Sequence, residues 1–290
     1  MQTMKNIKIW LGLAYIVFLG LFLYFLLTRI GLDELTSYDF LKSNSEHLIN
    51  FKKSNPILQK QRSIKNEIEI ELIRKACSIT KKGFERVLKF VKPDVWEYEI
   101  EAEFSHEFLK NRSKRFAYTP IIASGNNSNY LHYIQNNKQC KSGDIILMDV
   151  GAEYANYSSD MTRTIPVNGR FSERQKTIYN AVLNVKKNAT ELLRPGILWN
   201  DYHIEVGKIM TSELLKIGLL EKVDIKNQTK KNPAYKKYFS HGTSHHLGLD
   251  THDYCDLNLP LEKNMVLTVE PGIYIMKAVS YTHLTLPTKA

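Results

Sequence analysis

The pattern of hydrophobic and polar positions predicts a pair of helices early in the chain. Apolar residues recur at helical spacing until Pro93, which ends the helix because proline has no backbone N–H to donate. Asp94, with Glu97 three residues later, is typical of a capping box and predicts a second helix from Trp96 to Leu109. The positions that define the first helix are Ile70, Ile73, Cys77, Phe84, Leu88 and Val91.

A second pair of helices follows the same plan. The apolar residues of Thr177–Leu193 are in helical register, Pro195 follows, and Tyr202–Ile217 is again helical. Pro195 lies 102 residues after Pro93, so we infer an internal duplication, with a chance coincidence of two helical hairpins as the alternative. A duplicated α+β fold would place a site where polar groups of the two halves meet.

Three acids stand next to apolar, strand-like runs that follow Tyr118–Ser124. Asp149 comes after four hydrophobic residues, and a hairpin through Glu153–Asn156 would bring Asp160 to the same cavity. Glu270 ends another hydrophobic run before a Pro-Gly turn. A carboxylate is costly to bury unless it pairs or binds a cation, so these acids are candidate metal ligands. For Asp149 and Asp160 the alternative is an ordinary acid at a strand end.

The segment from His241 to Asp253 contains four of the nine histidines. Imidazole and carboxylate together suit Zn²⁺ or Co²⁺, and carboxylates suit Mn²⁺. Two such ions side by side can hold a hydroxide nucleophile and polarise a carbonyl, which is hydrolytic chemistry. The alternative is a solvated histidine-rich loop.

Composition and charge bound this picture. A length of 290 residues with 43% hydrophobic content allows one large domain or two ordinary ones. The net charge is +10, but the basic residues are mixed with Glu along the helices, which argues against a nucleic-acid partner. The cysteines Cys77, Cys140 and Cys255 have no C-x-x-C spacing, so we expect reduced thiols and a catalytic domain in the cytoplasm.

The residues before the helices predict a membrane segment and a linker. Ile9–Leu27 carries no charge and is long enough to cross a bilayer, so we expect a transmembrane helix within residues 1–30 that would anchor the protein to a membrane. A buried hydrophobic helix is the alternative, and the orientation in the membrane stays open. Residues 31–63 are polar and predict a linker, and residues 64–276 form the main domain.

The ordered set of motifs closely resembles the aminopeptidase P (Xaa-Pro aminopeptidase) branch of the pita-bread metallopeptidases, which also include prolidase, methionine aminopeptidase and creatinase. The resemblance covers roughly Glu67 to Ile275. It implies a duplicated α+β pita-bread fold with two divalent metal ions, commonly Mn²⁺. The motifs that carry it are Leu131-His132-Tyr133, Asp149-Val150-Gly151, Ser159–Thr164, His241–Asp253 and Thr268–Gly272.

The resemblance also implies which residues hold the two metals. Asp149 would chelate one ion, Asp160 would bridge both, and His245 and Glu270 would complete the other.

Four further residues receive roles in the same way. His132, His241 and His252 would line the substrate pocket, and His252 would hydrogen-bond the tetrahedral intermediate. Arg163 would orient the bridging acid, with a surface cation on a strand as the alternative.

The chain departs from the family pattern at both ends. Nothing after Ile275 resembles the Arg-x-Glu-Asp strand that carries a second bridging Glu in the family. Residues 277–290 predict a tail foreign to the fold, in which His283 is a poor ligand candidate. The membrane-like segment stands where relatives have an N-terminal domain. We therefore expect a C-terminally truncated catalytic domain that binds metal weakly and is slow or inactive.

The expected function is hydrolysis of the N-terminal Xaa-Pro bond of peptides with proline at the second position. Prolidase, which prefers dipeptides, is one alternative. A non-catalytic pita-bread binding module is another, and the retention of four metal ligands argues against it. A homo-oligomer is left open.

Overall fold

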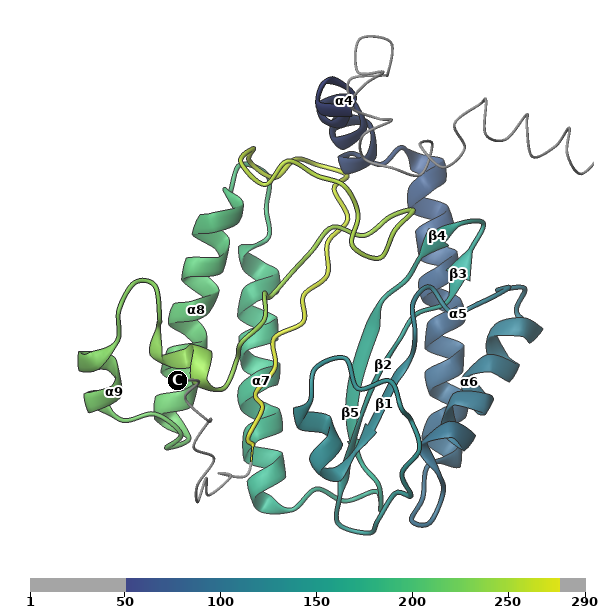
Figure 1. The fold of residues 1–290 in the computed structure, drawn as a ribbon, viewed down its shortest axis with the longest axis vertical. Coiled ribbons are helices and arrows are strands. Elements are labelled where there is room, and N and C mark those ends of the chain that lie inside the picture. The colour runs from purple at the N-terminus through teal and green to yellow at the C-terminus, as the bar shows by residue number, and fades with distance from the viewer. Residues whose placement is uncertain (1–50, 277–290) are drawn as a thin grey trace, which may run out of the picture. The chain divides into compact units, whose positions relative to one another are not determined.

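The computed structural model describes residues 51–276, and Figure 1 shows their elements. Within these residues no helix is long and apolar enough to cross a bilayer, and Ile9–Leu27 lies outside them. The long helix α5 (Glu67–Phe90), for example, has seven buried residues on one face and charged residues on the rest of its surface. As far as the structure describes the chain, the prediction of a transmembrane helix is wrong, and we do not retain the membrane anchor.

A helix occupies part of the segment that we expected to be a linker. It is α4 (Phe51–Ser63), and it includes Pro56. The chain divides into two compact units, residues 1–57 and 58–290, so this helix begins in the first unit and continues into the second. Its last two turns contact the histidine-rich segment, as described below. The predicted domain boundary at residue 64 stays a prediction.

The first half of the main unit is a helical hairpin packed on a sheet. Helices α5 and α6 (Glu97–Lys110) cover an antiparallel sheet of order β1-β2-β5, with strands Ile121–Ser124, Ile145–Val150 and Met161–Pro166. Alternate residues of β2, namely Ile146, Met148 and Val150, are fully buried in the apolar cluster that contains Phe104. Because side chains alternate along a strand, Asp149 points to the opposite face of the sheet.

The start of α6 differs from the predicted capping box. Trp96 is the N-cap, and its N–H donates to Glu99 Oε2 at 2.7 Å. Asp94 lies in the preceding turn with φ +75°. The carboxylate of Glu97 is buried instead, where it accepts hydrogen bonds from the N–H and Oγ of Ser124. The box at Asp94 and Glu97 is therefore wrong, because Glu97 holds strand β1 rather than the helix end.

The second half repeats the corner between the two helices. Helices α7 (Glu173–Leu192) and α8 (Trp199–Lys216) meet at Gly196, which has φ +93°, as Asp94 has φ +75°. Asp94 N–H donates to Cys140 O, and Gly196 N–H donates to Leu261 O in the same way. Each acceptor residue then donates its own N–H back to the residue after the corner. These matching bonds, 102 residues apart in the helical corner, support the duplication.

The sheet of the second half is irregular. The segment ending in Glu270 is not a strand, and it runs antiparallel to residues 243–247 with an isolated bridge between His246 and Leu267. Thr268 N–H donates to His245 O, but His245 N–H donates to the side chain of Thr268. The predicted strand is therefore wrong, because a side chain replaces a carbonyl in its hydrogen-bond ladder.

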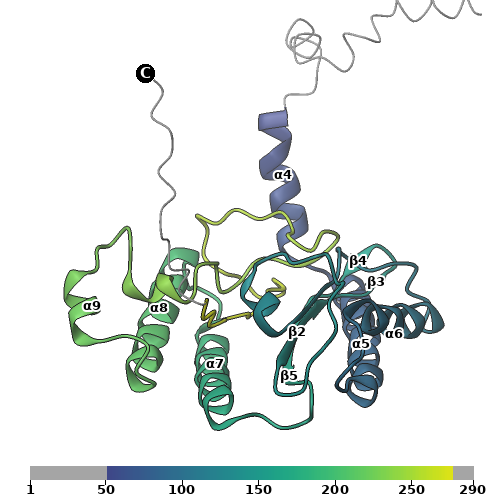
Figure 2. The ribbon, with the colours of Figure 1, turned by 60° about the horizontal axis from the view of Figure 1, so that its bottom comes forward.

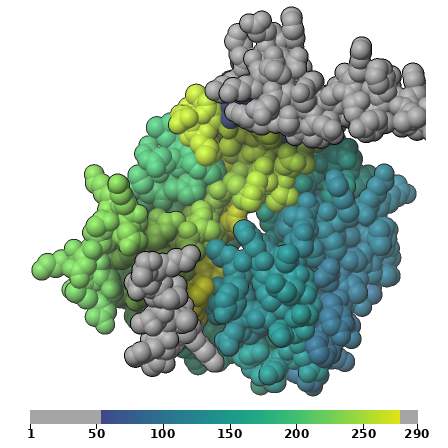
Figure 3. Space-filling view, viewed as in Figure 1, coloured from purple at the N-terminus to yellow at the C-terminus, as the bar shows by residue number. Residues whose placement is uncertain are grey.

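Each half has its own apolar cluster, and the sheet lies between the two helix pairs (Figure 2). In the second half Val206, Met210 and Leu214 of α8 are fully buried. Figure 3 shows residues from about 240 to 276, in yellow-green and yellow, at the surface between the two halves. The short elements are β3 (Glu153–Tyr154), β4 (Tyr157–Ser158), α9 (Lys222–Asn227), η1 (Gly125–Asn129) and η2 (Ala234–Lys237).

Candidate metal centre

Acids from the two halves converge on one imidazole. His245 Nε2 lies 3.2 Å from Asp160 Oδ2 and 3.1 Å from Glu270 Oε1. Thr268 Oγ1 also donates to Glu270 Oε1, at 3.0 Å. Since Asp160 belongs to the first half and His245 and Glu270 to the second, the predicted site lies at the junction of the halves.

Tyr118, which no motif in the sequence marks, connects Asp149 to this group. Its hydroxyl lies 2.5 Å from Asp149 Oδ1 and 3.0 Å from Asp160 Oδ1. Burial raises the pKa of Tyr118, and the negative charges of Asp149 and Asp160 raise it further. The phenol therefore stays protonated and donates. Its position at the start of a predicted strand gave no sign of this role.

A tight return of the chain brings Asp160 beside Asp149. The strands β3 and β4 form the predicted hairpin, and Ser159 N–H donates to Ala152 O at 3.0 Å. A Cβ on Gly151 would lie 1.8 Å from Ser159 O, so only glycine fits this crossing. The hairpin through Glu153–Asn156 is confirmed as the means that places both acids on one side of the sheet.

The electrostatics of the site follow from this crowding. Burial and the charge of Asp160 raise the pKa of Asp149 to about 7. Burial lowers the pKa of His245, but its hydrogen bonds to Asp160 and Glu270 outweigh this and raise the pKa to about 10. At neutral pH the imidazole of His245 is therefore protonated and holds the two carboxylates by its positive charge.

This donor set fits divalent cations in kind. Three carboxylates and one imidazole are the ligands that Mn²⁺, Co²⁺ and Zn²⁺ share. In residues 51–276 no three His, Cys, Asp or Glu side chains already surround one point as ligands. The donors instead contact one another and Tyr118. A metal ion would have to replace the proton of His245, and metal binding to such sites does release protons.

Two of the predicted pocket histidines lie beside the cluster formed by His245 and the acids. The ring of His252 packs against that of His245, with centroids 4.3 Å apart. His241 Nε2 lies 2.9 Å from the hydroxyl of Tyr274. Burial lowers the pKa of both His241 and His252, so both rings are neutral at pH 7.

His132 and Arg163 differ in how they relate to the acids. His132 lies in a backbone turn with φ +55°, close enough for its charge to lower the pKa of His241 and His252. Arg163 pairs in register with Met148, on the face of the sheet away from Asp149, and its guanidinium donates to the carbonyl of the preceding residue. The structure thus does not bring the Arg163 guanidinium to Asp160, and no described contact supports an orienting role for it.

Comparison with known proteins agrees with this geometry. Residues 71–288 match the profile of Metallopeptidase family M24. An Xaa-Pro aminopeptidase of Haemophilus influenzae is 41% identical over 80% of this chain and 55% of the relative. The Xaa-Pro aminopeptidase of Escherichia coli is 40% identical over 76% of this chain and 50% of the relative. The chain thus spans about half the length of the curated relatives that it matches.

Solved structures give the same result. Proline aminopeptidase P II from Yersinia pestis has a TM-score of 0.72 at 37% identity, covering 77% of this chain and 52% of that one. Zinc-substituted E. coli aminopeptidase P in complex with product has a TM-score of 0.71 at 38% identity, covering 77% and 51%. These likenesses confirm the predicted aminopeptidase P-like, pita-bread fold.

Proposed function

Because the chain belongs to metallopeptidase family M24, we propose that it hydrolyses the N-terminal Xaa-Pro bond of peptides with proline at the second position. The observation that supports this most is the convergence of Asp160, His245 and Glu270 from both halves. The names of its relatives, Xaa-Pro aminopeptidases, support the same substrate class.

We propose Asp149, Asp160, His245 and Glu270 as the ligands of two divalent ions, Mn²⁺ first, with Co²⁺ or Zn²⁺ as alternatives. Such ions supply a nucleophile at neutral pH and polarise a carbonyl. Tyr118 keeps Asp149 and Asp160 in one orientation through its two hydrogen bonds.

Three histidines are proposed to surround the substrate, and two of them, His241 and His252, are neutral at pH 7. His252, packed on His245, donates its N–H toward the oxygen on which charge develops during attack. His241, held by Tyr274, and His132 line the substrate pocket. The lowered pKa values of His241 and His252 suit a pocket that receives the cationic N-terminus of a peptide, because protonated rings would repel it.

Substrate length tests the function against its nearest alternative, prolidase. With Mn²⁺ added, the purified chain should release the first residue of a Gly-Pro-Yaa-Yaa peptide faster than it cleaves the dipeptide Gly-Pro. Cleavage of the dipeptide alone would favour prolidase. No cleavage of either substrate by the chain, under conditions where a full-length relative cleaves both, would contradict catalysis and favour a binding module.

A further inference from the structure

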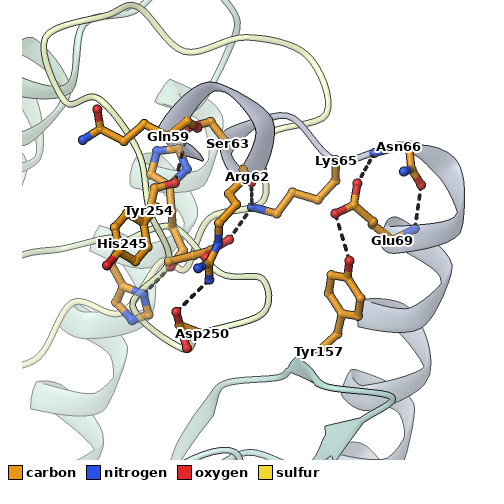
Figure 4. Close-up of polar contacts among 12 residues, drawn as sticks. Gln59, Arg62, Ser63, Lys65, Asn66, Glu69, Tyr157, His245, Asp250 and Tyr254 are labelled. Carbon is orange, nitrogen blue, oxygen red and sulfur yellow. Dashed lines mark hydrogen bonds and ion pairs between the residues drawn. The ribbon is translucent and has the colours of Figure 1, made fainter. Parts of the chain in front are cut away.

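An ion-pair network built around a buried pair joins the end of α4 to the histidine-rich segment (Figure 4). Lys65 Nζ lies 2.9 Å from Asp253 Oδ2, and both side chains are only 1% exposed. Arg62 Nη2 contacts the other oxygen of Asp253 and lies 2.7 Å from Asp250 Oδ2. The ammonium of Lys65 also donates to the carbonyl of Arg62. Asp253 therefore has a cation on each carboxylate oxygen.

Further contacts extend this attachment along the loop. Gln59 Nε2 donates to Cys255 O at 2.9 Å, and the guanidinium of Arg62 lies 4.8 Å from the ring centre of Tyr254. A Cβ on Gly248 would come within 2.1 Å of Asp253 Oδ2 and 3.0 Å of the Lys65 chain. The glycine thus gives the ion pair room to form inside the loop.

The network reaches two parts of the proposed active site. Asp253 directly follows His252, and its N–H donates to His246 O at 2.9 Å, which closes the loop behind the ring that packs on His245. The backbone N–H of Lys65 donates to Asn264 O at 3.0 Å, at the start of the segment that carries Glu270. Lys65 therefore contacts both the segment that carries His245 and the segment that carries Glu270.

Stability alone does not account for such a buried pair. Removing a lysine and an aspartate from water is costly, and packed apolar side chains of similar size often stabilise a fold as well. Directional bonds to both carboxylate oxygens instead fix the orientation of Asp253 and of the residue before it. We propose that Lys65 and Arg62 are positioning residues that hold His252 against His245 through Asp253. The inference rests on the proposed peptidase function.

Three variants of the full chain test the inference. Lys65→Met and Asp253→Asn each break the pair, and Lys65→Met/Asp253→Asn removes both buried charges, which recovers stability lost in the single variants. The proposal predicts that kcat for the Gly-Pro-Yaa-Yaa peptide falls roughly 10–100-fold in all three, with KM and bound Mn²⁺ nearly unchanged. A structural role alone predicts that kcat recovers with stability in the double variant, and that result would overturn the proposal.

The matched control is Lys81→Met on α5, which breaks an exposed ion pair with Glu85 at 3.6 Å. It should leave kcat at the parent value. Amide hydrogen exchange gives a readout that does not need catalysis: residues 246–255 should exchange faster in all three network variants, while α7 and α8 stay as in the parent.

The outcomes separate the two claims. A parent chain that does not cleave contradicts the proposed function alone, and exchange then decides on the network. Unchanged exchange across 246–255 in the network variants would overturn the positioning role whatever the parent does.

Discussion

The two halves of the main unit share their helical corner and differ in how they present polar groups. In the first half Asp149 lies within a regular strand, fixed by pairing with Ile121 on one side and Thr162 on the other. In the second half His245 and Glu270 lie on irregular segments, with side chains 20% and 29% exposed. The first half therefore presents Asp149 from a regular sheet, whereas the second presents its proposed ligands from irregular segments that depend on contacts from elsewhere, among them Lys65.

The largest expected effect is the loss of stability when a buried side chain of either apolar cluster is truncated. Phe104→Ala should destabilise the first half by about 3–5 kcal/mol and Leu214→Ala the second by about 2–5 kcal/mol, because both side chains are fully buried. Chemical denaturation with separate probes in the halves checks this. Leu109→Ala, at a side chain 64% exposed on α6, is the control and should stay within about 0.5 kcal/mol. If the halves unfold as one unit, both variants will shift both probes equally.

Tyr118→Phe should have the next largest effect. It tests whether the two acids of the first half depend on the Tyr118 hydroxyl. The change removes a hydroxyl that donates to Asp149 and Asp160 and leaves the ring in place. Metal affinity or turnover should fall roughly 10–100-fold, as for other partners of metal ligands. Tyr130→Phe, at an exposed side chain, is the matched control. An unaltered metal affinity in Tyr118→Phe would mean that the two acids need no such support.

The pH dependence of stability in the metal-free chain tests the second half, through the proton assigned to His245. His245 has a pKa raised from 6.5 to about 10, so its contribution to stability is complete below pH 6.5 and is lost as the pH rises to about 10. Melting temperatures should therefore be higher at pH 7 than at pH 10, and His245→Gln should flatten that slope. Added Mn²⁺ should reverse it, because metal competes with protons for the same atoms. An identical slope in parent and variant would contradict the assigned proton.

The smallest effect compares the two helical corners directly. Gly196→Ala places a side chain at φ +93° and should cost roughly 1–2 kcal/mol. Asp94→Gly should be neutral or slightly stabilising. Asp94 has φ +75°, and glycine adopts a positive φ without the steric strain of a side chain. Thermal unfolding of both variants checks whether the corners are equivalent. Opposite signs support the duplication, and destabilisation by Asp94→Gly would weaken it.

The sequence predicted most of the fold because helical periodicity is a local signal. The four long helices and the hairpin through Glu153–Asn156 are confirmed. The prediction of a strand before Glu270 was wrong. The sequence does not show that the Thr268 hydroxyl replaces a carbonyl as the acceptor of the His245 N–H. The start of α6 was wrong because burial of Glu97 against strand β1 is a tertiary effect.

The site was predicted only in part, because local motifs mark some of its residues and not others. Three of the four proposed ligands meet directly, and their motifs were legible in the chain. Tyr118 and Lys65 were not, because a tyrosine at a strand start and a lysine between helices have no distinctive pattern. Their roles arise only when distant segments fold together.

Metal binding by ligand variants from each half tests the central claim, that the two halves jointly hold the metal. Bound Mn²⁺ would be measured by elemental analysis after equilibrium dialysis of the parent, Asp149→Ala and Glu270→Ala, with Lys81→Met as the control. The account predicts that the parent and the control bind Mn²⁺ and that loss of either ligand lowers occupancy at least 10-fold, beyond what an outer partner typically costs. Equal metal content in the parent and Asp149→Ala would contradict it.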